Sequence, residues 1–145
     1  SDPSTVEGQW GEAAFSGEAN NGCAAIDNAC NGEILIVPAV RKSDGKKVSI
    51  ALQSVPLGPG RTRVGVYFKE VTSGMTPQTM ASYWEKPYKV TDQPSAYSTM
   101  VLQSNGNIAF YYEEENKPVD GGFDMVYKEI PVDSLTFDRY KIWKR

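Results

Sequence analysis

The chain contains no histidine, which excludes the Ser-His-Asp and Cys-His nucleophile arrangements and any zinc site built on histidine. It has only two cysteines, Cys23 and Cys30, which are too few to close a structural metal site. Their spacing suits either a disulfide formed in an oxidising compartment or two unpaired thiols that flank a turn. We therefore expect neither a metal nor another cofactor, and the pairing of the two cysteines stays open.

Clustered positive charge and long hydrophobic runs are also missing. The 15 Lys and Arg residues are scattered among 18 Asp and Glu residues, and the net charge is −3. No basic face is therefore expected, and nucleic acid is not an expected partner. The longest apolar run, Ile34 to Val40, is interrupted by Pro38 and is far shorter than the roughly 20 residues that span a bilayer, so we expect no transmembrane helix. The first residues show no targeting peptide.

Short apolar runs bounded by Gly, Pro, Asn and Asp recur along the 145 residues, whereas helical periodicity is almost absent. This pattern predicts an all-β fold of antiparallel strands. The expected strands are 33–40, 47–55, 63–71, 86–90, 97–103, 107–113 and 122–130, with turns at Asp44-Gly45, 56–60 and 104–106. The tail from Val132 could hold a short helical turn capped by Asp133 or Ser134. Two successive groups of strands suit either a sandwich or consecutive β-propeller blades.

Two sequence motifs are more specific than this general pattern. Residues 54–67 read Ser-Val-Pro-Leu-Gly-Pro-Gly-Arg-Thr-Arg-Val-Gly-Val-Tyr, in which a Ser-x-Pro turn leads to an arginine just before a strand. Residues 96–98 read Ala-Tyr-Ser and precede an apolar strand, a glycine turn and an Ile-x-Phe-x-Tyr-Glu strand that ends at Glu113. In order and spacing, these motifs resemble the last part of a bacterial-type exo-α-sialidase, a neuraminidase of the six-bladed propeller family with Asp-box (BNR) repeats.

The resemblance implies a role for three residues. Arg61 would be the third arginine of the triad that binds the sialic acid carboxylate, and it is assigned over Arg63 by its place in the motif. Tyr97 would be the nucleophile, and Glu113 the acid that orients the first arginine. Guanidinium groups pair bidentately with carboxylates. A phenol attacks without the charge that the substrate carboxylate would repel, but only about one part in a thousand of a free phenol is ionised at neutral pH, so a neighbouring base must take its proton.

The same resemblance implies that residues 1–145 are the C-terminal portion of a longer sialidase-like protein. They would form about two antiparallel four-stranded blades, one over about 20–92 and one over about 93–131, followed by a tail at 132–145. In the family, the activating glutamate, the acid/base aspartate and two triad arginines lie upstream. The early acidic residues Asp2, Glu7, Glu12 and Glu18 lack the motifs that surround those groups. We therefore expect the chain alone to be inactive.

The expected partners are sialic acid-containing glycans and the missing N-terminal blades, and the expected location is secreted or periplasmic. Two alternatives stay open. The first is a non-catalytic carbohydrate-binding or scaffold domain that shares the blades. The second is a small independent β-sandwich in which the match to the sialidase motifs is accidental.

Overall fold

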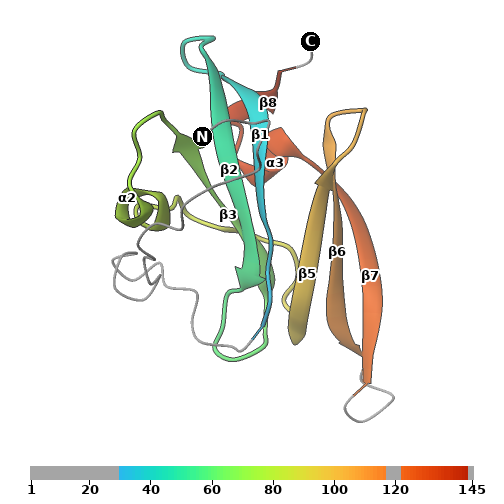
Figure 1. Ribbon diagram of the computed structural model, residues 1–145. Helices are drawn as coiled ribbons and strands as arrows, with labels where there is room; N and C mark the ends of the chain where they lie inside the picture. The colour runs from blue at the N-terminus through green and yellow to red at the C-terminus, as the bar shows by residue number, and fades with distance from the viewer. Residues whose placement is uncertain (1–29, 117–121, 144–145) are drawn as a thin grey trace, which may run out of the picture.

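A computed structural model of the chain describes residues 30–116 and 122–143, and most of the regular structure there is antiparallel β-strand (Figure 1). The strands are β1 (Ile34–Arg41), β2 (Lys47–Pro56), β3 (Val64–Val71), β4 (Tyr88–Lys89), β5 (Ser95–Leu102), β6 (Asn107–Asn116), β7 (Gly122–Pro131) and β8 (Tyr140–Ile142). Two short helices, α2 (Pro77–Ala81) and α3 (Val132–Leu135), lie in the connections between strands. The prediction of an all-β chain is confirmed.

The strands form two sheets. One has five strands in the order β4-β3-β2-β1-β8, and the other has three in the order β5-β6-β7. Both numbers differ from the expected four strands per blade. The second sheet has one fewer because only β5, β6 and β7 of the described strands lie in it, and the first has one more because the tail returns to it as β8. There β8 pairs with the end of β1, with Ala39 opposite Ile142 and Arg41 opposite Tyr140. The strand expected at 86–90 is shorter than predicted, since only Tyr88–Lys89 pair with β3.

Local turn chemistry explains the first hairpin. Gly45 has a φ of +71°, which glycine adopts at little cost, and its N–H donates to the Arg41 carbonyl at 2.8 Å. The Asp44 carboxylate accepts a 3.1 Å hydrogen bond from the Lys46 N–H. The Asp-Gly dipeptide therefore reverses the chain where the sequence predicts it.

The sequence predicts only one of the two helices, the short turn in the tail from Val132, and α3 confirms it. Helix α2 lies in the long polar connection after β3, for which the sequence predicts no element, and it begins with a capping box in which Thr76 and Thr79 bond reciprocally. Pro77 occupies its first turn, where a missing N–H costs nothing. The expected cap of the last helical turn was wrong: Pro131 is the N-cap of α3 and makes no side-chain hydrogen bond, while Asp133 lies inside the first turn.

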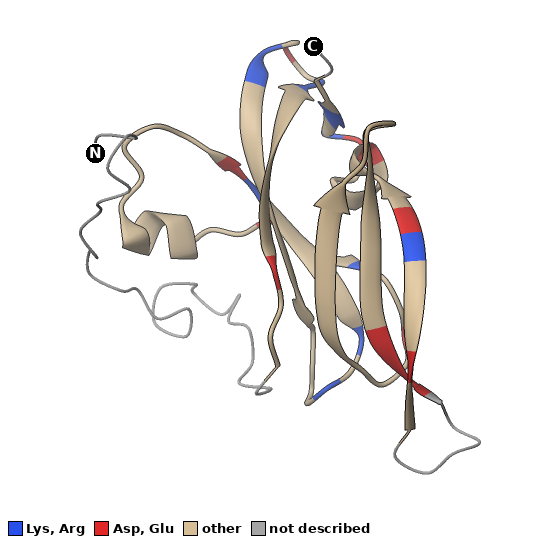
Figure 2. Ribbon diagram, turned by 45° about the vertical axis from the view of Figure 1, so that its right-hand side comes forward, with Lys and Arg blue, Asp and Glu red and all other residues tan. Residues whose placement is uncertain are grey.

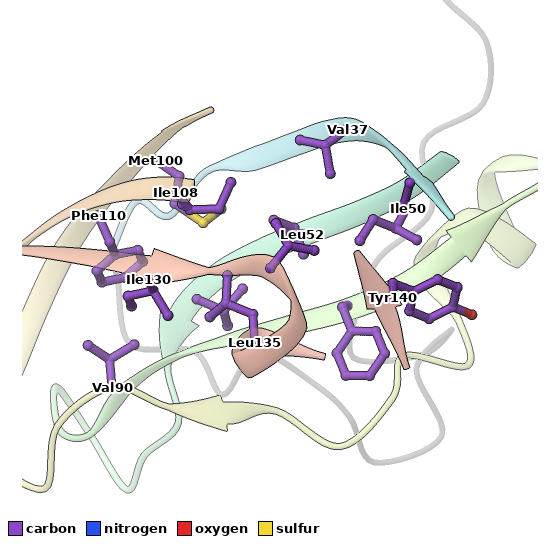
Figure 3. Packing of buried hydrophobic residues seen from close by; sticks show 14 of the residues in the cluster. Val37, Ile50, Leu52, Val90, Met100, Ile108, Phe110, Ile130, Leu135 and Tyr140 are labelled. Atoms are coloured by element: carbon purple, nitrogen blue, oxygen red, sulfur yellow. The ribbon is translucent and has the colours of Figure 1, made fainter. Parts of the chain in front are cut away.

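The two sheets share one hydrophobic core. Figure 3 shows side chains from the first sheet, among them Val37, Ile50 and Leu52, sharing the interior with Ile108 and Ile130 of the second sheet. Leu135 of α3 is fully buried in the same cluster. The helix and β8 therefore help to close the core at the end of the chain. No helix in the described ranges is long and apolar enough to span a membrane.

Candidate functional site

The loop between β2 and β3 is joined to the start of β5 by backbone hydrogen bonds. The Ser95 N–H donates to the Arg61 carbonyl at 2.9 Å, and the Arg63 N–H donates to the Gln93 carbonyl at 2.9 Å. Thr62 and Pro94 form an isolated bridge between these two segments. The Ser95 hydroxyl adds a third hydrogen bond between the two segments, because it accepts from the Val64 N–H at 2.7 Å. Residues 61 and 97 are thereby held at the same end of the molecule.

Arg61 and Tyr97, two of the residues singled out by the sialidase-like motifs, are in contact. The Arg61 guanidinium carbon lies 5.3 Å from the centre of the Tyr97 ring, which is cation–π geometry. The Tyr97 side chain is 40% exposed, and Arg61 is also exposed. Arg63 is used differently, because its guanidinium donates to the Gly58 carbonyl within its own loop. The two neighbouring arginines therefore differ in role: Arg61 faces the tyrosine and Arg63 braces the loop.

Tyr97 lies in an irregular part of β5. Ser95 pairs with Glu114 and Ser98 pairs with Tyr112, so three steps along β5 match two steps along β6. The extra residue is the signature of a β-bulge, a feature that re-aims side chains and is common beside active sites. The bulge places the Tyr97 side chain toward solvent beside the β2–β3 loop.

Glu113 lies on β6 opposite the bulge, and Cys30 lies close to Arg61. The half-buried Cys30 thiol lies beside the Arg61 guanidinium and interacts electrostatically with the Glu113 carboxylate. Burial raises the pKa of Cys30, Arg61 lowers it and Glu113 raises it again. Figure 2 shows basic residues on the β2–β3 loop and acidic residues on β6 at the same end of the molecule. Arg61, Tyr97, Glu113 and Cys30 are called the end site below.

A second tyrosine is paired with a carboxylate on the inner face of β6. The Tyr112 hydroxyl donates to Glu114 Oε2 at 3.0 Å, and Thr91 Oγ1 donates to the same oxygen at 2.6 Å. Tyr112 is fully buried, and this burial together with Glu114 raises its pKa to about 12. A phenol so hard to ionise is a poor nucleophile. This pair links β6 to the segment after β4, and we assign it a structural role.

The chemistry available at the end site is a guanidinium, an exposed phenol, a carboxylate and a thiol. Within residues 30–116 and 122–143, no three His, Cys, Asp or Glu side chains lie close enough together to hold a metal ion. The guanidinium of Arg61 is a group that binds anions, and the Tyr97 side chain beside it is exposed. The early acidic residues and Cys23 lie outside the described part of the chain.

Sequence reasoning missed two residues at this end of the molecule. The sequence suggests Cys30 only as half of a disulfide or as an unpaired thiol beside a turn, and Glu33 only as the start of a strand. Neither carries a local signal, because Glu33 meets β5 and Cys30 meets the β2–β3 loop only through contacts between residues far apart in sequence. No protein-family model matches this chain, and a search of curated proteins finds no significant match.

Proposed function

We propose that the chain is part of a retaining glycoside hydrolase that releases terminal sialic acid from glycoconjugates. The observation that carries the proposal is the contact between Arg61 and Tyr97, with Glu113 on β6 opposite the bulge that holds Tyr97. These residues come from the β2–β3 loop, β5 and β6, and the motifs that contain them are the ones that resemble a sialidase. An accidental match of short motifs gives no reason for their side chains to meet.

In this proposal Arg61 and Tyr97 act on adjacent atoms of the sugar. The anomeric carbon of sialic acid carries a carboxylate, so a nucleophile must approach next to a negative charge. Arg61 binds that carboxylate through its guanidinium, while Tyr97, whose ring lies beneath it, attacks the anomeric carbon as a neutral phenol. The covalent glycosyl-tyrosine intermediate is then hydrolysed by water, which restores the original anomeric configuration.

Glu113 lies on β6 opposite the bulge that carries Tyr97, and it is half-buried. We assign it to orient a further arginine that comes from the upstream portion of the protein. That portion also supplies the base that takes the Tyr97 proton and the acid that protonates the leaving group. General-base help of this kind contributes about 10²–10⁴ in rate, so the chain alone should turn over little substrate.

The outer face of the three-stranded sheet is the surface on which we place the upstream blades. Six large apolar side chains lie there with exposures between 40% and 67%: Tyr97, Val101, Tyr111, Phe123, Met125 and Tyr127. Large apolar side chains exposed together on one sheet face mark a surface that binds another protein segment. Two more exposed side chains, Ile34 and Ile36, lie on β1. A secreted or periplasmic location belongs to the same proposal.

A second candidate is a non-catalytic carbohydrate-binding domain built on the same sheets. It is favoured by the closed core, because β8 pairs with β1 and Leu135 of α3 is buried with side chains of both sheets. In this reading Arg61 and Tyr97 bind an acidic sugar without cleaving it. The two candidates differ in whether the Tyr97 hydroxyl is needed.

The test is turnover of a fluorogenic sialoside by the protein purified with any co-purifying upstream polypeptide, whose presence is read from intact mass. Wild type should cleave the substrate, and Tyr97→Phe should lose at least about a hundredfold in rate because the nucleophile is gone. Tyr111→Phe is the matched control, since Tyr111 is 42% exposed on the same sheet face. Equal activity in Tyr97→Phe and wild type would rule out the proposed role. An intact complex that binds sialosides without turnover, equally well in Tyr97→Phe, would establish the binding domain instead.

A further inference from the structure

The edge of β5 that faces away from β6 is hydrogen-bonded to the carboxylate of Glu33. Among the residues that the structure describes, β5 is an edge strand of the three-stranded sheet and pairs with β6 alone. On its other side the Met100 N–H donates to Glu33 Oε2 at 2.8 Å, and the Thr99 hydroxyl donates to the same oxygen. Glu33 lies just before β1, in the other sheet. One side chain therefore satisfies an edge-strand N–H and links the two sheets.

Glu33 is itself held firmly in place by β2. Its N–H donates to Ser54 Oγ at 3.0 Å, and its carbonyl accepts a 2.9 Å hydrogen bond from the Ser54 N–H. Ser54 is fully buried, and the Ser98 hydroxyl of β5 donates to Ser54 Oγ at 2.9 Å. Glu33 and Ser54 together form a rigid link from β2 to the segment of β5 that follows the bulge.

The bulge that carries Tyr97 thus lies between two anchors. Before it, Ser95 is bonded to Arg61 and Val64 of the first sheet. After it, Thr99 and Met100 are bonded to Glu33. A bulge lacks regular ladder hydrogen bonds, so the direction of its side chains depends on how its two ends are fixed.

We propose that Glu33 is a positioning residue for the end site, and that its clamp on Thr99 and Met100 holds Tyr97 against Arg61. The inference rests on the proposed function for its catalytic meaning, since it makes Glu33 the residue that aims the nucleophile. Glu33 acts through β5 and needs no contact with substrate. Its carboxylate has the chemistry for this task, because an ionised acceptor binds an N–H and an O–H more strongly than a neutral one.

The test measures the Tyr97 to Arg61 contact directly in the whole chain, as a nuclear Overhauser effect between the tyrosine ring and the arginine side chain. Glu33→Ala should abolish this contact and speed hydrogen exchange at the Met100 amide by at least about tenfold, the scale of one hydrogen bond to a charged group. Glu33→Gln, which keeps an acceptor oxygen, should retain the contact. Glu85→Ala is the control, because it also removes a glutamate carboxylate and its link to a distant residue, a 2.8 Å ion pair to Arg139, away from β5.

Persistence of the contact in Glu33→Ala, or its equal loss in Glu85→Ala, would overturn the proposal. If Glu33→Ala does not fold, Thr99→Val decides: a weakened contact supports the clamp, and an unchanged contact overturns it. Because this readout uses no ligand, it is independent of the proposed function. Turnover by the complete protein, compared between wild type, Glu33→Gln and Glu33→Ala, then tests the catalytic meaning: the rate should fall in Glu33→Ala and recover in Glu33→Gln.

Discussion

Replacing Tyr112 by phenylalanine should change how the stability of the fold depends on alkaline pH. Tyr112 is fully buried, its hydroxyl donates to Glu114, and its pKa is raised to about 12. In the unfolded chain a tyrosine ionises near pH 10. The folded chain therefore holds this proton more tightly, and the stabilisation is fully present below pH 10 and is lost as the pH rises toward 12.

The size of the effect follows from these two values. At pH 11 the difference between a pKa of 12 and one of 10 lowers the free energy of unfolding by about 1.4 kcal/mol relative to pH 8. At pH 8, Tyr112→Phe should be less stable than wild type by roughly 1–2 kcal/mol, because it loses a hydrogen bond to a carboxylate. The variant escapes the alkaline loss, so the gap between the two proteins should shrink by about 1.4 kcal/mol at pH 11.

Urea unfolding of both proteins at pH 8 and pH 11 measures this gap. Glu114→Gln is a second variant for the same measurement. Burial is the first cause of the raised pKa of Tyr112 and Glu114 is the second, so the pH dependence of stability should be reduced but not removed. An equal gap between wild type and Tyr112→Phe at the two pH values would refute the reasoning. It would mean that Tyr112 ionises as readily in the folded chain as in the unfolded one.

Three further predictions concern other charged groups. Cys30 should be alkylated at pH 8 more slowly in Arg61→Ala and faster in Glu113→Gln, as followed by peptide mass spectrometry. The reason is that Arg61 lowers and Glu113 raises the pKa of the thiol. Changes of the same sign in both variants would contradict the geometry of the end site. Arg41 lowers the pKa of Glu70 below its ordinary 4.5. Wild type should therefore lose thermal stability as the pH falls from 5 to 3, and Glu70→Gln should lose less. Equal losses in the two proteins would argue against the Arg41–Glu70 pair. Lys69 is buried and donates to the Thr79, Met80 and Ser82 carbonyls. Lys69→Met should therefore lower the free energy of local opening in residues 72–87 by about 1–3 kcal/mol, as measured by amide hydrogen exchange. Unchanged protection of these amides would contradict the prediction.

Most of the strands could be predicted from the sequence because their signals are local. Alternation of apolar residues and an Asp-Gly turn are enough to place the β1–β2 hairpin, and Gly45 adopts the conformation that such a turn requires. Helix α2 also has a local signal, since Thr76 and Thr79 stand at capping-box spacing with Pro77 between them, but the surrounding connection is polar and shows no helical periodicity.

The pairing of β8 with β1 could not be predicted in the same way. Arg41 and Tyr140 are neighbours in the sheet but lie about a hundred residues apart in sequence, and no turn residue encodes such a contact. The meeting of Arg61 with Tyr97 is of the same long-range kind. It was expected only because the motifs that contain them resemble those of one enzyme family. Glu33 and Cys30 belong to no such motif, so their places beside β5 and Arg61 emerge only from the folded structure.

The central claim is that Tyr97 is a glycosidase nucleophile, and the covalent intermediate tests it most directly. The complete protein would be treated with a sialosyl fluoride that carries a second fluorine beside the anomeric carbon, which slows hydrolysis of the glycosyl-enzyme more than its formation. Proteolysis and mass spectrometry should then find the sugar on the peptide that contains Tyr97, with no adduct in Tyr97→Phe. An adduct on another residue, or an active protein that forms no adduct, would contradict the account.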